Sequence, residues 1–115
     1  MDSILDTVKT GLGVQLDDHV FDNELVLHIN SAIMSSFQSI GIGVNDFFIL
    51  DSAQTWADYI GADTNLEGIK TLIVLKTRLI FDPPTSSFVI ESLNRQIDEL
   101  TWRLMVKNET ETPTV

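Results

Sequence analysis

Apolar residues recur at alternating steps of three and four along most of the chain. The clearest example is the last long stretch, where the stripe consists of Ile90, Leu93, Ile97, Leu100 and Leu104. This period places apolar side chains along one face of an α-helix that packs on a core. The same period predicts helices over about residues 3–10, 22–40, 53–60 and 66–81. The pattern therefore predicts an all-α fold, a small bundle of four to five helices.

Glycine and proline mark the expected helix ends. Gly11 and Gly13 end the first helix, and Gly41 closes the second. The Asp-Pro-Pro sequence at residues 82–84 stops the fourth helix, because proline lacks the amide donor and restricts the residue before it. A serine or threonine at residues 85–87 can then cap the last helix. This short connection predicts that the last two helices form a C-terminal antiparallel hairpin.

Two of the predicted helices carry large apolar residues on the face opposite their main stripe. In the helix over residues 22–40, Leu27 and Met34 lie seven apart on that side. In the last helix, the opposite face carries Phe88, Trp102 and Val106. A small domain rarely needs both faces of its terminal helix for one core, so these second faces favour assembly with other copies of the chain.

Charged residues of alternating sign accompany the second face of the last helix at a spacing of four. They are Glu91, Arg95, Glu99 and Arg103. In one interpretation they form a solvated ladder along the helix. In the other, which we favour, they pair across a subunit interface in which Phe88 and Trp102 are the apolar anchors. The candidate interface in this helix comprises Phe88, Arg95, Glu99, Trp102, Arg103 and Val106.

Four large apolar residues in a row, Phe47-Phe48-Ile49-Leu50, lie in a turn-rich connection between two predicted helices. Leaving them in water costs about 1.5–3 kcal/mol each relative to burial. They either cover the core or meet a neighbouring subunit. We favour the core, because connecting segments often cover small helical domains, and we keep Phe47 and Phe48 as candidate interface residues.

Charge divides the chain into two unequal halves. The 115 residues carry a formal net charge of −10 and fit one domain. Ten carboxylates and one cation, Lys9, lie in residues 1–64, whereas residues 65–115 hold seven carboxylates and six cations. This balance argues against ordinary duplex binding, which needs lysine and arginine at the phosphates. It permits repulsion of DNA from a channel wall, binding to a basic partner, or solubility alone.

Candidate chemistry is sparse. The chain has no cysteine, which excludes disulfides and thiolate nucleophiles. Asp17, Asp18, His19 and Asp22 form the densest group of possible metal ligands, but their spacing matches no known loop geometry, so they are interpreted as helix caps. His28 is interpreted as structural, and no nucleophile elbow or phosphate loop occurs. We therefore expect no catalytic, cofactor-binding or metal site, no enzymatic activity and no membrane-spanning segment.

The chain resembles the head–tail connector (adaptor, head-completion) proteins of long-tailed bacteriophages and prophages. In the C-terminal half the resemblance rests on Leu79-Ile80-Phe81-Asp82-Pro83-Pro84, Ser87, Glu91-Ser92-Leu93-Asn94-Arg95-Gln96-Ile97 and Glu99-Leu100-Thr101-Trp102-Arg103-Leu104. In the N-terminal half it rests on Asp22-Asn23-Glu24-Leu25, His28-Ile29-Asn30, Gly41-Ile42-Gly43-Val44 and Thr55-Trp56. It covers roughly residues 3–106, which we expect to form a single connector domain followed by a flexible polar tail at 107–115.

The resemblance implies a structural virion protein of the phage neck, assembled in the bacterial host cytoplasm. It implies a ring, a dodecamer when assembled, that docks under the portal protein and joins the DNA-filled head to the next neck or tail (stopper) protein. DNA would pass through the channel without specific binding, and the polar tail would order on docking to a partner ring. The acidic half leaves one alternative, a small inhibitor that mimics nucleic acid and blocks a basic DNA-binding partner.

Overall fold

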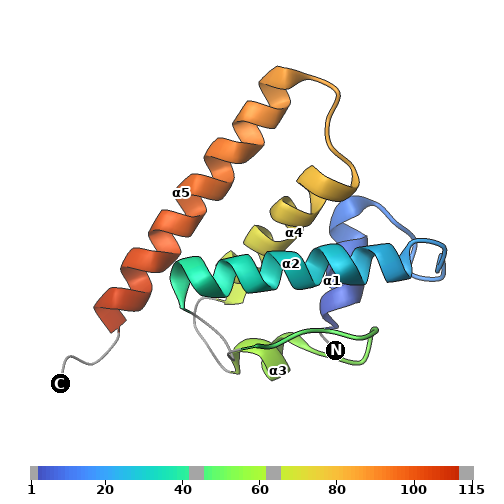
Figure 1. Cartoon of the computed structure of the whole chain (residues 1–115), viewed down its shortest axis with the longest axis horizontal. Helices are drawn as coiled ribbons and strands as arrows, with labels where there is room; N and C mark the ends of the chain where they lie inside the picture. Colours follow the sequence, from blue (N-terminus) through green and yellow to red (C-terminus); the bar gives the residue numbers. More distant parts are fainter. Residues whose placement is uncertain (1–2, 42–45, 62–65, 112–115) are drawn as a thin grey trace.

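Five α-helices make up the described part of the computed structural model, which covers residues 3–41, 46–61 and 66–111 (Figure 1). They are α1 (Ile4–Leu12), α2 (Asp22–Ile40), α3 (Trp56–Ile60), α4 (Leu66–Phe81) and α5 (Ser87–Glu111). The all-α bundle predicted from the sequence is confirmed. No helix within the described ranges has both the length and the apolar composition that a bilayer crossing requires.

The first helix shows two different uses of glycine. Ser3 caps α1, its side chain accepting a hydrogen bond from the Asp6 N–H, and Gly13 ends the helix in the left-handed conformation at φ 80°. The prediction that Gly11 also ends this helix is wrong. Gly11 lies inside α1, where a Cβ would come 2.8 Å from Cγ1 of Val74. Its lack of a side chain lets α1 and α4 approach closely.

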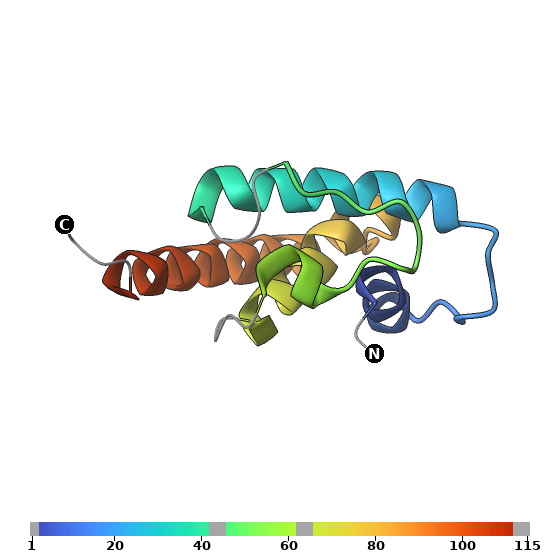
Figure 2. The same cartoon turned by 90° about the horizontal axis from the view of Figure 1, so that it is seen from below.

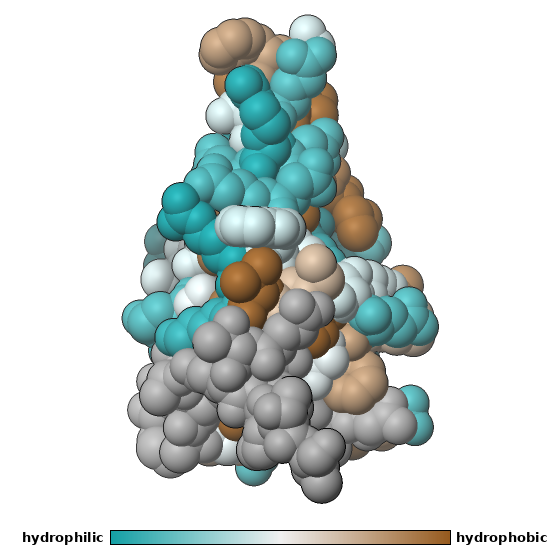
Figure 3. Space-filling view, turned by 90° about the vertical axis from the view of Figure 1, so that its left-hand side faces the viewer, coloured by the Kyte–Doolittle hydropathy of each residue, from teal (hydrophilic) through white to brown (hydrophobic). Residues whose placement is uncertain are grey.

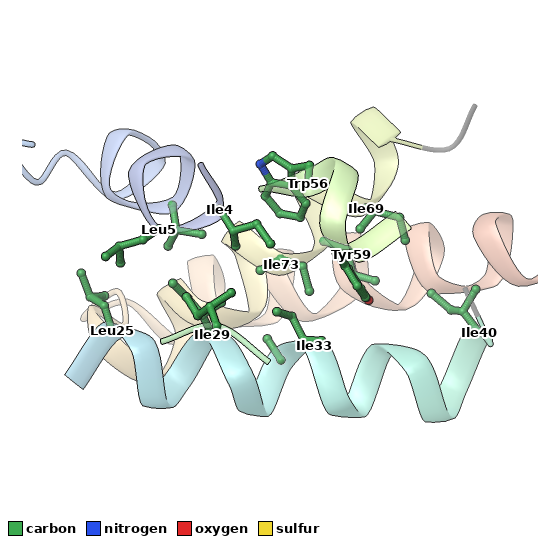
Figure 4. Packing of buried hydrophobic residues seen from close by; sticks show 14 of the residues in the cluster. Ile4, Leu5, Leu25, Ile29, Ile33, Ile40, Trp56, Tyr59, Ile69 and Ile73 are labelled. Atoms are coloured by element: carbon green, nitrogen blue, oxygen red, sulfur yellow. The ribbon is translucent and has the colours of Figure 1, made fainter. Parts of the chain in front are cut away.

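Helix α4 is the centre of the bundle, because it packs against α1, α2 and α5. Its buried residues Ile69, Leu72 and Ile73 meet the inward residues of α1 and α2 (Figure 4). Ile80, which the period places on the same stripe, is instead exposed. Residues outside the stripe, such as Val74 and Leu75, are half-buried against the core, as expected of a helix with neighbours on several sides.

The short helix α3 is fastened to the start of α1. Thr55 caps α3 in a capping box with Asp58 and forms an isolated antiparallel bridge with Ser3. Trp56 is buried, and its Nε1–H donates a 3.0 Å hydrogen bond to the Thr7 hydroxyl. Trp56 thus anchors the segment between α2 and α4.

The last two helices form the expected antiparallel hairpin, and α5 lies beside α2 as well (Figures 1 and 2). Leu93, Ile97 and Leu104 are buried on the inner face of α5, with Leu104 packed close to Gly68 at the beginning of α4. The helix continues to Glu111, five residues past the domain boundary expected at 106. Residues 112–115 of the expected tail lie outside the described residues.

Candidate subunit interface

A pair of hydrogen bonds fixes the segment after α2 against that helix. The Asn30 side chain accepts a 2.7 Å hydrogen bond from the Ile49 N–H and donates a 3.0 Å bond to the Ile49 carbonyl. Beyond this point, Oε1 of Gln54 accepts hydrogen bonds from the backbone N–H groups of Leu50 and Asp51. The segment is therefore held at two places by side-chain amides, which replace backbone partners in a region without sheet.

Side chains alternate along this held segment. Phe47 is half-buried and stacks on Tyr59 at a ring distance of 5.1 Å, and Ile49 is fully buried. Phe48 and Leu50 point the other way and are exposed. The expectation that this run covers the core therefore holds for Phe47 and Ile49 and fails for Phe48 and Leu50. This alternation is expected of an extended chain, in which neighbouring side chains point to opposite sides.

The held segment and the outer face of α2 form an apolar groove of about 360 Å³, here called the α2 groove. Its lining residues are Leu27, Asn30, Ser31, Ile33, Met34, Phe37, Gln38, Asp46, Phe47 and Phe48. Leu27, Met34 and Phe48 are 65%, 59% and 58% exposed, respectively. The second face predicted for this helix from Leu27 and Met34 is thus present on the surface, and Phe48 completes it.

A second exposed face runs along α5. Phe88 is 71% exposed, Trp102 60% and Val106 37%. This side of the molecule is mostly hydrophilic, with hydrophobic residues among the polar ones (Figure 3). The α5 outer face, defined as Phe88, Arg95, Glu99, Trp102 and Val106, therefore mixes apolar and charged groups, a composition typical of interfaces formed after folding.

Two of the charged candidates already pair within the chain. Nη2 of Arg103 lies 2.6 Å from Oε1 of Glu99, one helical turn away, and both side chains are exposed. This geometry is that of the solvated ladder, which contributes only a few tenths of a kcal/mol. Arg95 forms no salt bridge with any described side chain. It lies between Phe88 and Trp102 along the α5 outer face.

A buried lysine is the feature that the sequence analysis missed. The Lys9 side chain is 1% exposed, and its Nζ donates to the carbonyls of Leu16 (3.3 Å) and Asp18 (2.6 Å) and to Oδ1 of Asp22 (2.8 Å). Lys9 follows Leu5 by four residues, so its inward position could have been read from the helical period. The pKa of Asp22 lies below its usual value. The main cause is the hydrogen bond with Lys9, and the second is the hydrogen bond with His19.

Asp18 and Asp22 of the acidic group bind this lysine. The interpretation of the group as helix caps is wrong, because α2 begins after Phe21 without a side-chain cap. Asp22 also pairs through Oδ2 with Nδ1 of His19 at 2.8 Å, and Oδ1 of Asp18 accepts from the Val20 N–H. Among the described residues, no three His, Asp or Glu side chains come together as a metal site would need. Since Lys9 is the single Lys or Arg of residues 1–64, its burial leaves the described surface of that half without a lysine or arginine.

A second lysine borders a separate pocket of about 390 Å³ between α2, α4 and α5. Nζ of Lys76 donates to the hydroxyls of Ser35 (2.9 Å) and Ser36 (3.2 Å). Desolvation lowers the pKa of Lys76. This lysine therefore joins α4 to α2 through neutral partners.

Comparison with known proteins identifies a family. The family model for the phage connector protein matches residues 4–111, which is nearly the whole chain. No curated protein and no solved structure matches the chain. The matched range includes all five helices, the α2 groove and the α5 outer face. The chain therefore belongs to the phage connector protein family and has a phage connector role.

Proposed function

We propose that this chain forms a ring that docks under the portal protein and links the DNA-filled head to the next neck or tail protein. The observation that carries the proposal is the combination of the family match with two exposed apolar faces on different helices. Each subunit of a closed ring needs two different patches, one for each neighbour. The α2 groove and the α5 outer face supply two such patches on one chain.

The electrostatic character of the chain suits a position around DNA. Apart from the buried Lys9 and Tyr59, residues 1–64 contribute only carboxylates and histidines as ionisable side chains. A surface of this sign repels the phosphate backbone, so DNA would move past it without adhering. We infer that the N-terminal half is the part of the subunit nearer to the channel, and that the cation-bearing hairpin of α4 and α5 lies farther away.

The C-terminal segment at residues 107–115 is proposed to contact a partner ring. It follows the last apolar residue of the α5 outer face and is polar throughout except for Pro113 and Val115. Deleting these residues should weaken binding to the partner ring while the helical content of residues 1–106 persists. Unchanged portal binding by the shortened chain would contradict this role.

Virion assembly provides the experiment. A phage that lacks this chain should accumulate DNA-filled heads and separate tails that do not join, as seen by electron microscopy, and the wild-type gene should restore intact virions. Complete, infectious particles without the chain would contradict the proposal. The family match supports this function over the acidic inhibitor, for which loss of the chain should leave virion morphology unchanged.

A further inference from the structure

We propose that the α5 outer face of one subunit packs into the α2 groove of the next, with Trp102 as the anchor in the groove. This pairing rests on the ring proposed above and names the surfaces that would build it. The occupant of the groove is a second copy of this chain.

Both faces carry large apolar side chains that are exposed. Met34 and Phe48 stand at the groove with more than half of their surface open to solvent, and Ile33 is buried at its base. Trp102 and Phe88 are exposed to a similar extent on the other helix. Large aromatic side chains that fill a pocket on the partner dominate binding energy at protein interfaces. A tryptophan facing an apolar groove meets that description, with Phe88 as a second contact.

Spacing allows the two helices to lie along each other. Phe88, Arg95 and Trp102 follow one another at intervals of seven residues, so they form a nearly straight row on α5. Leu27 and Met34 have the same interval on α2. Rows of this period on two helices can pack together over several turns without diverging.

Charge argues for contact between unlike faces. All lysines and arginines except the buried Lys9 belong to α4 and α5, including Arg95 in the α5 row. The groove is bordered by the exposed carboxylate of Asp46, and Glu24 lies one turn before Leu27 on α2. A contact between two α2 grooves would oppose two acidic surfaces. A contact of α5 with the groove instead brings Arg95 towards the acidic half, while Glu99 of the same face is already paired with Arg103.

Complementary variants test the pairing. Met34→Glu disables the groove but leaves α5 intact, whereas Trp102→Glu disables the α5 face but leaves the groove intact. Each variant alone should lose assembly, because every contact needs one face of each kind. An equimolar mixture should form a 1:1 dimer and stop there, as measured by light scattering or native mass spectrometry. Val20→Glu, at an exposed apolar residue outside both faces, should assemble as the wild type does.

Disulfide trapping gives an independent readout, since the chain contains no cysteine of its own. Met34→Cys and Trp102→Cys are prepared as separate proteins and oxidised alone or mixed. The mixture should give the mixed dimer, and each protein alone should give little. Where assembly of the wild type requires the portal protein, both experiments include it.

The outcomes separate this inference from the proposed function. Rings that persist in both glutamate variants, or disulfides that form equally well between identical cysteines, would overturn the face pairing while leaving a ring-forming connector in place. A wild-type chain that neither assembles nor binds the portal protein would overturn the proposed function itself.

Discussion

The side chain of Asn30 pairs with both backbone groups of Ile49, at 2.7 and 3.0 Å, and so joins the middle of α2 to a segment nineteen residues later. The arrangement resembles one step of a sheet ladder made by a side chain. It buries Ile49 in the core and turns Phe48 outwards over the α2 groove. Packing of the core and shape of the candidate interface therefore depend on the same two hydrogen bonds.

Replacing Asn30 tests this dependence. Asn30→Ala should lower the free energy of unfolding by about 2 kcal/mol, because the Ile49 amide and carbonyl lose their partners. Urea denaturation measures the loss, and hydrogen exchange at the Ile49 amide should become faster. Ser31→Ala, at the adjacent exposed residue of α2, is the control and should change stability by less than about 0.5 kcal/mol. An Ile49 amide that exchanges as slowly as in the wild type would contradict the account.

The salt bridge between Lys9 and Asp22 should make stability depend on acid pH. The pKa of Asp22 is lower in the folded chain than its ordinary value of 3.8, so this carboxylate stabilises the fold above that pH. The contribution is lost as pH falls through the folded pKa. Asp22→Asn should cost about 2 kcal/mol at pH 7, as expected for a hydrogen bond to a charged group, and much less near pH 2.

Urea denaturation of wild type and Asp22→Asn at several pH values measures this effect. Asp17→Asn is the matched control, because Asp17 is exposed and lies in the same loop. Its effect on stability should be small at every pH. A cost of Asp22→Asn that is the same at pH 7 and pH 2 would show that the charge of Asp22 is not what Lys9 requires.

Removing the hydroxyl group of Tyr59 should stabilise the protein. Its hydroxyl is buried and has no hydrogen-bond partner in the part of the chain that the structure describes, and burial raises its pKa to about 12. Tyr59→Phe should therefore raise the free energy of unfolding by about 1 kcal/mol at pH 7. A destabilised Tyr59→Phe variant would show that the hydroxyl is satisfied.

Tyr59 should also make the stability of the wild type decrease at alkaline pH. The unfolded chain ionises this tyrosine near pH 10 and the folded chain near pH 12, so wild-type stability falls as pH rises through that window. Tyr59→Phe should lose this part of the pH dependence. Ultraviolet absorbance titration of the phenol in the native protein measures the shift directly.

Gly11 and Val74 should be coupled, because a Cβ at residue 11 would come 2.8 Å from Cγ1 of Val74. Gly11→Ala gains helix propensity but overpacks the contact, so it should destabilise the wild type by about 1–2 kcal/mol. The same change in a Val74→Ala background should cost less, or should stabilise. Equal costs in the two backgrounds, measured by thermal or urea denaturation, would show that the contact with Val74 is not limiting.

Periodicity predicted the helices and the inner stripe of α5 because each depends on one face meeting one core. It failed where several neighbours compete. Ile80 shares the period of Ile69 and Ile73, yet it is exposed, because it borders the open pocket between α2, α4 and α5 and not the packed core. The local sequence does not distinguish Gly11 from a helix terminator, because close approach of another helix leaves no mark in it.

The candidate site was foreseen in part for similar reasons. The outward faces of Leu27, Met34, Phe88 and Trp102 follow from helical spacing and are present on the surface. The α2 groove could not be foreseen, because Phe48 reaches it only through the long-range bonds between Asn30 and Ile49. Which of these residues contact another subunit stays a prediction.

The proposed function requires that this connector assembles into a ring on the portal protein. The most direct test is the mass of the purified chain by multi-angle light scattering, alone and then mixed with the portal protein of the same phage. The expected result is a large discrete ring, or a monomer that joins the portal protein in a fixed stoichiometry. A chain that stays monomeric and ignores the portal protein at every concentration would contradict it and would favour an acidic inhibitor.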